Sequence, residues 1–444
     1  MTIARLLATL DEFAGEVVRR VRPELPDVAA LFPATFRNTL ATTVRPQPDG
    51  TVHVITGDIP AMWLRDSAAQ VAPYLVLARD DPGFAELVAG VVRRQVRHIR
   101  HDPYANAFNE SPSGARWDPR DRPAASEWVW ERKFELDSLC YPVRLAHQLW
   151  RATGSTAHID AEFVSAAALI LSVRATERHH EQRSRYRFVR LGEGLDRDGR
   201  GGPTAYTGLI WSGFRPSDDP CLLHYHVPAN AFAAVTAGHL AEMARAVGNA
   251  KLATAAAGLA ADLTSAIATH AVVTHARHGR VYAYEIDGLG GRLLADDANI
   301  PSLLSLPYLG WCRPDDPLYT ATRSLVLSAS NPWYHQGSRV NGIGSPHLGE
   351  QPYVWPLALI MQALTATSVD ERVRVLRVLA RSDGGTGLMH EGVHADDPNR
   401  FTRPWFGWAN SLFAELVLLH AGFPLPAMPQ HLLGVTSAGE CYAR

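Results

Sequence analysis

ANAFAAVTAGHLAEMARAV (Ala229–Val247) is followed, four residues later, by LATAAAGLAADLTSAIAT (Leu252–Thr269). In both stretches apolar residues recur every three to four positions, which is the period of an α-helix that buries one face. The short link between them predicts two helices packed side by side as a helical hairpin. These two stretches therefore point to a fold assembled from paired helices.

The same period recurs along the rest of the chain, whereas strand-like alternation is limited to Gly279–Ile286 and Thr51–Gly57. We expect an all-α toroid of about six helical hairpins. A helical solenoid is the competing architecture, but no internal repeat is visible. Nine further helices are predicted, at Ile3–Val21, Ser67–Ala78, Phe84–Ile99, Leu136–Thr153, Ala161–Thr176, Pro317–Ser328, Val354–Thr367, Val369–Arg381 and Gly407–His420.

Length and charge narrow the class of protein. The 444 residues carry 43 basic and 45 acidic side chains, a net charge of −2, which gives no global field toward nucleic acid or an anionic membrane. No Ser- or Pro-rich linker divides the chain, so we expect one domain over residues 1–444. The sequence leaves the oligomeric state open.

Targeting and metal signals are weak. No signal-peptide pattern and no run of about 20 apolar residues was found, so we expect a cytoplasmic protein without a membrane span. The cysteines form no CxxC pair, and their spacing suggests neither a zinc site nor a disulfide framework. They are Cys140, Cys221, Cys312 and Cys441.

Long loops rich in Gly, Pro and aromatic residues separate the helices, and long loops in a compact domain are usually functional. Their composition suits a sugar-cleaving site, which needs two carboxylates, aromatic faces for the C–H patches, and polar groups for the hydroxyls. These loops are Asn106–Trp130, Tyr206–Pro228, Ser330–Glu350 and Gly384–Pro404.

Two acidic stretches are candidates for this site. TGDIPAMWLRDS (Thr56–Ser67) places Trp63, Arg65 and Asp66 just before a predicted helix, where Asp66 could equally be an N-cap. WSGFRPSDDP (Trp211–Pro220) places Asp218 and Asp219 next to each other. Adjacent carboxylates raise each other's pKa, which suits a general acid, although Ser-Asp-Asp-Pro is also ordinary turn chemistry.

Two later loops complete the set of candidates. Asn331–His347 carries Asn341 and His347 among glycines that permit close approach of a ligand, or it is a plain surface loop. His390-Glu391-x-x-His394 matches a zinc-peptidase pattern, which requires both histidines on one face of a helix. Glycines and prolines crowd this stretch, so we expect no helix and interpret Glu391 as a lone carboxylate.

Other acidic pairs and aromatic residues have a simpler interpretation. Glu135 and Asp137 in FELD, and Asp296 and Asp297 in DDANIP, each precede a predicted helix. We expect them to cap those helices, where the dipole favours negative charge. The tryptophans of Glu127–Glu131 fit the core as well as they fit a sugar platform.

Taken together, these loops resemble glycoside hydrolase family 125, the exo-α-1,6-mannosidases. The resemblance extends from residue 56 to about residue 410. The matching stretches are TGDIPAMWLRDS (Thr56–Ser67), KFELDSLCYP (Lys133–Pro142), GFRPSDDP (Gly213–Pro220), DDANIPSLLSLPYLG (Asp296–Gly310), GIGSPH (Gly342–His347) and the MHEG segment around Glu391.

The resemblance implies an (α/α)6 barrel and an inverting, metal-independent hydrolysis of terminal α-1,6-linked mannose, without a cofactor. It implies Asp218 as general acid, with Asp219 the alternative, and Glu391 as general base. The substrate would be a mannose-containing oligosaccharide or N-glycan fragment. The chain departs from the family pattern at Cys221–His226, where a Tyr- and Gly-rich run is expected, so its linkage preference stays open. We expect the sugar to be bound by Trp63, Arg65, Asp66, Arg215, Asp219, Asn341, His347, Arg403 and Trp405.

Two other classes of function remain as alternatives. A binding module would keep the aromatic loops and lack one of the two carboxylates, but both are present here. A sugar epimerase on the same barrel would work through a histidine pair such as His390 and His394.

Overall fold

The structure, a computed structural model, describes residues 2–426 and 428–433; Cys441 lies outside them. It is mostly helical, with 48% of residues in helices. The α-helices are α1 (Ile3–Val21), α2 (Pro26–Thr42), α3 (Leu64–Val71), α4 (Leu75–Ala78), α5 (Pro82–His101), α6 (Tyr141–Thr153), α7 (Ala161–Glu177), α8 (His180–Arg183), α9 (Asp196–Gly199), α10 (Val227–Ala246), α11 (Ala250–His270), α12 (Leu306–Leu309), α13 (Pro317–Val326), α14 (Pro356–Leu364), α15 (Val369–Ala380), α16 (Gly407–His420) and α17 (Gln430–Leu433).

Short 3₁₀ turns and strands occupy the connections between these helices. The 3₁₀ turns are η1 (Ala72–Tyr74), η2 (Leu136–Leu139) and η3 (Pro346–Leu348). The strands are β1 (Val44–Pro46), β2 (Val52–Val54), β3 (Met62–Trp63), β4 (Ala107–Phe108), β5 (Val129–Glu131), β6 (Tyr225–His226), β7 (Val272–His275), β8 (Gly279–Tyr282), β9 (Glu285–Ile286), β10 (Arg292–Leu293), β11 (Tyr334–Gln336), β12 (Asn341–Ile343), β13 (Tyr353–Val354), β14 (Gly392–His394) and β15 (Phe401–Thr402).

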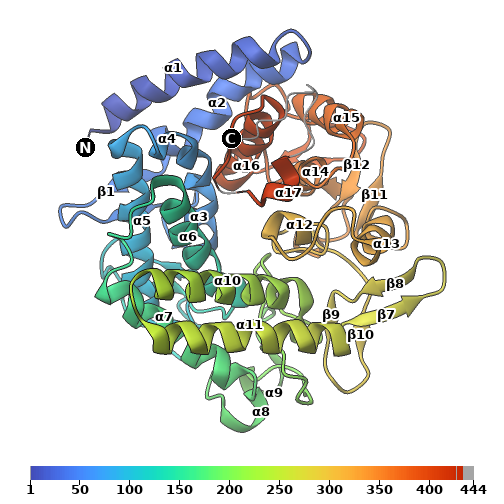
Figure 1. Ribbon diagram of the computed structural model, residues 1–444. Helices are drawn as coiled ribbons and strands as arrows, with labels where there is room; N and C mark the ends of the chain where they lie inside the picture. The colour runs from blue at the N-terminus through green and yellow to red at the C-terminus, as the bar shows by residue number, and fades with distance from the viewer. Residues whose placement is uncertain (1, 427, 434–444) are drawn as a thin grey trace.

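The hairpin predicted from the opening stretch is confirmed. α10 and α11 pack along their length and lie side by side in Figure 1. The Asn249 side chain caps α11 by accepting a hydrogen bond from the Leu252 N–H, as expected at an N-cap. Leu259, Leu263 and Ile267 lie on the buried face of α11. Because this helix buries one apolar face, its apolar residues recur every three to four positions, and this pattern is visible in the sequence.

α11 is long and apolar enough, by length and composition alone, to cross a membrane. This differs from the sequence-based expectation that no such stretch exists. The helix passes the test because it is rich in alanine. Its face away from α10 carries polar side chains such as Lys251, Asp262 and Ser265, as in an amphipathic helix of a packed hairpin.

One helix was not predicted. α2 contains Pro26 at its start and Pro33 inside, and proline disfavours a helix interior. Proline is tolerated in the first turn of a helix, and packing against α1 and α16 holds the remainder in place. The predicted helix Leu136–Thr153 is divided into η2 and α6.

The chain follows a closed circuit in Figure 1, from α1 at the top, past α7 and α11 below, to α13 on the right and back to α16. α16 packs against α2 and α3, so the last long helix meets the first ones. A single large apolar core of buried side chains runs from Leu6 to Leu432 through these helices. The closure brings loops that are far apart in the sequence close together.

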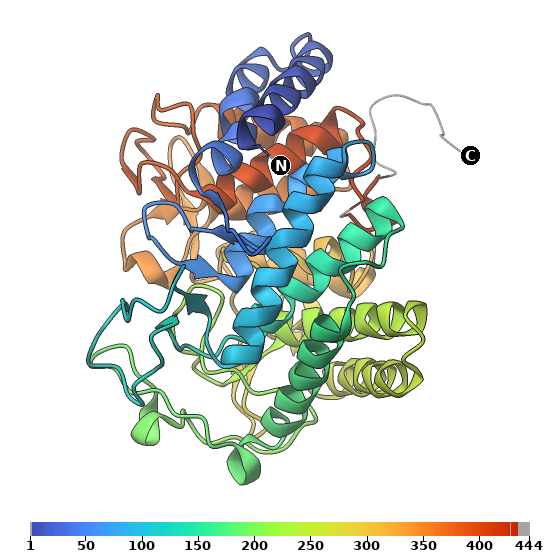
Figure 2. The same ribbon diagram turned by 90° about the vertical axis from the view of Figure 1, so that its left-hand side faces the viewer.

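Loops and short sheets gather on one side of the molecule, on the left in Figure 2. Two of the three-stranded sheets there have the orders β3-β4-β5 and β13-β14-β15, and both are antiparallel. Trp63 pairs with Ala107 in the first sheet, and Gly392 pairs with Thr402 in the second. These sheets therefore position the acidic stretch at Arg65 and the loop at Glu391 relative to the helices.

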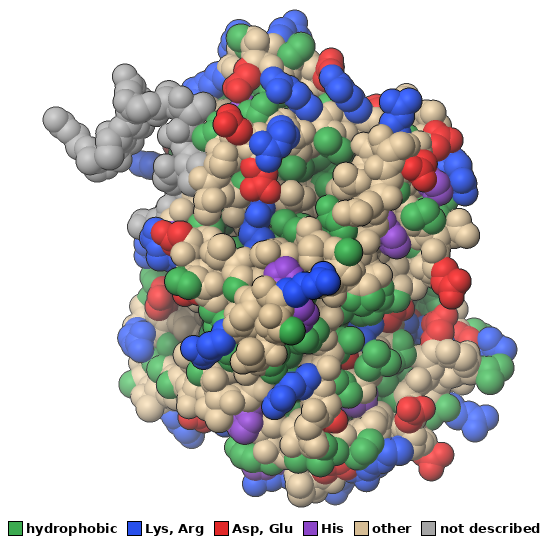
Figure 3. Space-filling model, turned by 90° about the vertical axis from the view of Figure 1, so that its right-hand side faces the viewer, with side chains coloured by type: hydrophobic (Ala, Val, Ile, Leu, Met, Phe, Trp, Pro, Cys, Tyr) green, Lys and Arg blue, Asp and Glu red, His purple; other side chains and the backbone are tan. Residues whose placement is uncertain are grey.

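The surface shown in Figure 3 carries Lys and Arg side chains interspersed with Asp and Glu. Apolar side chains are scattered between them on this face. The view agrees with the near-zero net charge of the sequence.

Candidate active site

The predicted loops converge on one pocket of about 450 Å³, a volume suited to a small ligand. It is lined by both polar and aromatic groups, including Trp117, Trp355, Phe406 and Trp408. The sequence-predicted residues that line it are Trp63, Arg65, Asp66, Asp218, Asp219, His347, Glu391 and Arg403.

Asp66 is not an N-cap. α3 begins at Leu64 with Trp63 at the cap position, so Asp66 is the third residue of the helix and its side chain faces the pocket. It is 3% exposed, and burial raises its pKa despite the neighbouring Arg65. A buried carboxylate that lines a pocket is available to a ligand hydroxyl.

Arg65 forms the floor of the pocket and is surrounded by carboxylates. Its guanidinium lies 2.6 Å from Glu135, 3.3 Å from Asp137, and 3.5 Å from both Asp66 and Asp218. Glu135 and Asp137 are fully buried here, so the expectation that they only cap a helix was wrong. Their side chains turn inward to the guanidinium because the charge of Arg65 needs buried partners.

Asp218 projects into the pocket from a tight turn. Its backbone has φ +67°, a left-handed conformation that aspartate tolerates better than most residues. Hydrogen bonds from the Arg215 N–H to the Asp219 carbonyl (2.8 Å) and from the Asp218 N–H to the Arg215 carbonyl (3.0 Å) close the turn. Burial disfavours the Asp218 carboxylate, but a hydrogen bond with Glu135 and the charges of Arg65 and Lys133 together lower its pKa.

Asp219 faces a different set of partners. It accepts a hydrogen bond from the Ser217 hydroxyl (3.0 Å) and lies 3.1 Å from Nδ1 of His347 on η3. Burial disfavours a charge on His347, but the Asp219 carboxylate overcomes this and raises the pKa of the histidine to about 9. The two adjacent aspartates therefore diverge, Asp218 toward the floor and Asp219 toward the rim.

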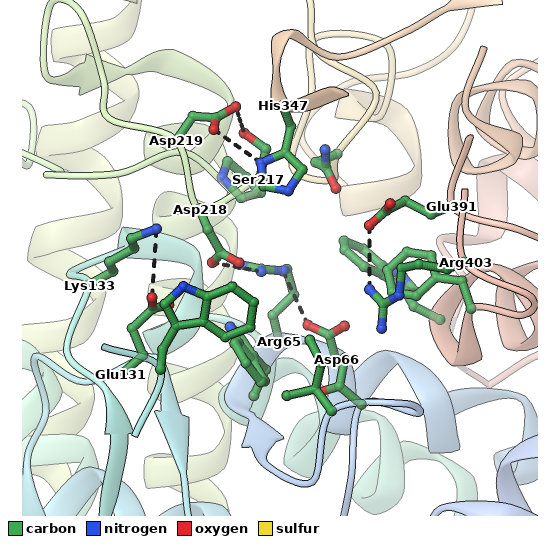
Figure 4. Close-up of a pocket in the computed structure, with 18 of the residues that line it drawn as sticks. Arg65, Asp66, Glu131, Lys133, Ser217, Asp218, Asp219, His347, Glu391 and Arg403 are labelled. Carbon is green, nitrogen blue, oxygen red and sulfur yellow. Dashed lines mark hydrogen bonds and ion pairs between the residues drawn. The ribbon is translucent and has the colours of Figure 1, made fainter. Parts of the chain in front are cut away.

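Glu391 faces Asp218 across the pocket in Figure 4. It immediately precedes β14, and its carboxylate accepts hydrogen bonds from the Thr402 hydroxyl (3.2 Å) and from Arg403 (3.4 Å). Arg403 is itself paired with Asp58 from the Thr56–Ser67 stretch. The β14–β15 pairing thus fixes the orientation of Glu391.

The zinc-peptidase pattern has the wrong local structure. Residues 392–394 form strand β14, so His390 and His394 do not share a helix face. Both ring nitrogens of His390 lie at hydrogen-bond distance from backbone carbonyls, and the ring stacks on Phe401. Neither histidine lines the pocket, which also removes the support for an epimerase pair. In residues 2–426 and 428–433, no three His, Cys, Asp or Glu side chains are grouped to hold a metal ion.

Three predicted binding residues lie elsewhere. Arg215 is 3% exposed and pairs with Glu285 at 2.6 Å behind the Asp218 turn. Asn341 is exposed on β12, and its side chain accepts the N–H of Gly337. Trp405 does not line the pocket, and its ring lies against Gly57. These residues lie in or beside the candidate loops in the sequence, but their side chains do not point into the pocket.

Several pocket residues were not predicted individually. Glu131 is the last residue of the tryptophan-containing stretch Glu127–Glu131, and Lys133 is the first residue of the KFELDSLCYP stretch. Asn299 belongs to DDANIP, where Asp296 accepts the N–H groups of Leu303 and Leu304; both precede α12, so the expectation that Asp296 caps that helix was wrong. Trp355 carried no sequence signal, because a tryptophan before a helix fits a core equally well.

Comparisons with known proteins agree on the family. The sequence model of the metal-independent α-mannosidases, glycoside hydrolase family 125, matches residues 25–418. The Meiotically up-regulated gene 157 protein of Schizosaccharomyces pombe is 42% identical over 433 residues, covering 91% of this chain and 84% of its own length.

Solved structures give the same result. A metal-independent α-mannosidase from Streptococcus pneumoniae, in a non-productive substrate complex with α-1,6-mannobiose, is 42% identical with a TM-score of 0.90. The match covers 94% of this chain and 97% of that one. A bacterial glucoamylase complexed with acarbose is 13% identical with a TM-score of 0.56, covering 92% of this chain and 56% of that one, and shares the fold alone. The resemblance inferred from the sequence is confirmed, and the chain belongs to glycoside hydrolase family 125, the metal-independent α-mannosidases.

Proposed function

We propose that this α-mannosidase removes terminal, non-reducing α-1,6-linked mannose from an oligosaccharide such as an N-glycan fragment, with inversion of configuration. The observation that carries the proposal is the pair Asp218 and Glu391, which face each other across a single pocket. An inverting glycosidase needs one carboxylic acid and one carboxylate with room for water between them, at roughly 6.5–9.5 Å.

Asp218 is the general acid in this proposal. It protonates the glycosidic oxygen as the bond to the anomeric carbon breaks. Its contacts support this role over Asp219, because Asp218 adjoins the buried carboxylate Glu135, whereas Asp219 is engaged by Ser217 and His347. Asp219 instead keeps His347 charged at the rim.

Glu391 is the general base. It takes a proton from the water that attacks the anomeric carbon from the face opposite the leaving group. Thr402 and Arg403 both donate to its oxygens and hold them toward the pocket, and a carboxylate that only accepts hydrogen bonds suits two such donors. Proton uptake by Glu391 and proton donation by Asp218 balance over one turnover.

Asp66, Arg65 and His347 bind the hydroxyls of the terminal mannose, and Trp408 supplies an apolar face. A floor closed by Arg65 and its carboxylates leaves room only for the end of a chain, which supports exo action. Trp117 and Lys133 also line the pocket, and in this proposal they contact the leaving group. The α-1,6 linkage rests on the mannobiose held by the Streptococcus pneumoniae relative.

We also propose that residues 1–444 form a single (α/α)6 barrel domain. The continuous core, the packing of α16 on α2 and α3, and hairpins such as α10–α11 support it. A cytoplasmic location remains a prediction.

The direct test is hydrolysis of α-1,6- and α-1,2-mannobiose with and without excess EDTA. We expect mannose from the α-1,6 isomer at a rate that EDTA leaves unchanged. Cleavage of the α-1,2 isomer alone, or loss of activity on chelation that zinc or calcium restores, would overturn the proposal.

A further inference from the structure

Glu135 is a buried carboxylate next to the proposed acid, and the hydrolytic mechanism above does not use it. It is 0% exposed and ends the strand-like segment before η2. The amide of Asn106 lies between it and Asp218, with Nδ2 at 3.3 Å from Glu135 Oε1, 3.2 Å from Asp218 Oδ1 and 3.0 Å from Glu131 Oε2. Asn106 Oδ1 accepts the Lys133 N–H (3.1 Å), which fixes the amide with its NH₂ group toward the carboxylates.

The charges at the floor of the pocket do not balance if every carboxyl is ionised. Asp66, Glu135, Asp137 and Asp218 surround the one guanidinium of Arg65. Lys133 lies nearby, but its Nζ is shared with Glu131 (3.7 Å) and Glu193 (3.8 Å). Uncompensated buried charge is costly, so a buried acid in such a cluster retains a proton.

The hydrogen bonds indicate which oxygen carries the proton. Oε2 of Glu135 accepts from Arg65 (2.6 Å) and from the Ser138 hydroxyl (2.9 Å), so both of its acceptor positions are used by donors. Oε1 lies instead beside the Asn106 amide, and a side-chain hydrogen bond joins Glu135 to Asp218. A proton on Oε1 can therefore be donated to the Asp218 carboxylate.

The electrostatics of the pair agree with this placement. Burial raises the pKa of Glu135 well above its usual range, and the nearby Asp218 adds to that rise against the charge of Arg65. The pKa of Asp218 is lowered in turn. Two interacting carboxyls lose their protons in steps that belong to the pair, so the first proton is shared between them.

We propose that Glu135 is a positioning residue that holds the proton which Asp218 delivers to the leaving group, an inference that rests on the proposed function. As the glycosidic bond breaks, the proton on Glu135 Oε1 moves to the Asp218 carboxylate, and Asp218 delivers it to the glycosidic oxygen. Glu135 is then an anion stabilised by Arg65 and Ser138. After the leaving group departs, a proton from solvent returns through Asp218 and restores the pair.

The test compares Glu135→Gln, Asp218→Asn and Asp137→Asn on two substrates, α-1,6-mannobiose and 2,4-dinitrophenyl α-mannoside. The aryl leaving group needs no protonation. A glutamine at 135 keeps the shape and the acceptor for Arg65, but its NH₂ group donates permanently to Asp218 and has no proton to transfer. Asp137→Asn is the matched control, because Asp137 contacts the same guanidinium from the same 3₁₀ turn.

We expect Glu135→Gln to lower kcat/KM for mannobiose by about 10²–10³-fold and for the aryl substrate by less than about tenfold, as for Asp218→Asn. The alkaline limb of the mannobiose pH profile should move to lower pH by about one unit or more, because the amide donor favours ionised Asp218. The charged and titratable groups around the pair are unchanged in both Glu135→Gln and Asp218→Asn; they are Arg65, Lys133, Asp66, Asp137, Glu131 and His347. Asp137→Asn should affect both substrates equally.

Equal losses on both substrates in Glu135→Gln, or no loss on either, overturn the role of Glu135 and leave Asp218 as acid. If Asp218→Asn itself shows no dependence on the leaving group, the proposed function fails instead. Should Glu135→Gln not fold, neutron diffraction of the wild-type protein decides the question. Deuterium between the carboxylates of Glu135 and Asp218 is the expected result, and its absence there contradicts the proposal.

Discussion

The α10–α11 hairpin buries leucine, isoleucine and alanine, whereas the floor of the pocket places three buried carboxylates and the partly exposed Asp218 around Arg65. Apolar burial stabilises the fold by about 1.5–3 kcal/mol for each large side chain. Burying a charged side chain costs desolvation free energy, and an ion pair with a neighbouring side chain offsets only part of that cost. The comparison teaches that the helical scaffold supplies the stability and holds together a site that would not form on its own.

The largest expected effect is on the chemistry at the site. Glu391→Gln should lower kcat on α-1,6-mannobiose by about 10³–10⁴-fold, because the amide cannot take a proton from water, while binding and the unfolding temperature are retained. Steady-state kinetics and product binding by calorimetry measure both. Glu350→Gln, a charge-matched change on an exposed loop residue, is the control; similar losses in both variants would show that loop charge and not general base chemistry is responsible.

A substitution in the helical scaffold should lower stability and leave catalysis unchanged. Leu263→Ala on the buried face of α11 should lower the free energy of unfolding by about 2–5 kcal/mol through lost burial and a cavity, with kcat unchanged where the protein stays folded. Thr264→Ala, on the exposed side of the same turn, should change it by about 0.5 kcal/mol or less. Equal effects of the two in denaturant unfolding would contradict the assignment of stability to this hairpin.

Asp66 tests whether buried charge at the site serves binding and not stability. Asp66→Asn should lower kcat/KM by roughly 10–100-fold, as expected for loss of a charged hydrogen bond to a hydroxyl. It should leave the unfolding temperature unchanged or raised, because it relieves burial of a carboxylate among three others. Unchanged kinetics with a lower unfolding temperature would make Asp66 a structural residue.

The smallest expected effect is the change with pH in the stability that the His347–Asp219 pair contributes at the rim of the pocket. The folded-state pKa of His347 is raised to about 9 from an ordinary 6.5, so its pairing with Asp219 stabilises the fold fully below about pH 6.5. That contribution is lost as the pH rises toward 9, and it is small because the side chain is 39% exposed. Unfolding temperatures measured from pH 6 to 10 should therefore fall less in His347→Gln than in the wild type. Parallel curves would show that the pair contributes nothing.

The same contrast explains what the sequence could predict. α1 and α11 were predicted because a helix that buries one face repeats its apolar residues every three to four positions. α2 was missed, since its prolines have the same local signature as a loop. The helical class followed from these local signals, and the family resemblance followed from the sequence motifs of the loops.

The site was predictable only in part. Asp66, Asp218 and Glu391 were found because a pocket for sugar needs carboxylates on its loops. Arg215 and Asn341 were misplaced, and Glu135 was taken for a cap, because local sequence does not reveal whether a side chain points toward the pocket or another partner. That choice depends on contacts between segments far apart in the chain.

The most direct test of the central claim is the anomer of mannose formed first from α-1,6-mannobiose, followed by proton NMR before mutarotation. If Asp218 and Glu391 act as acid and base with water between them, β-mannose appears first. If α-mannose appears first, the enzyme retains configuration. Glu391 would then be a nucleophile about 5 Å from the acid, and the assignment made here would be wrong.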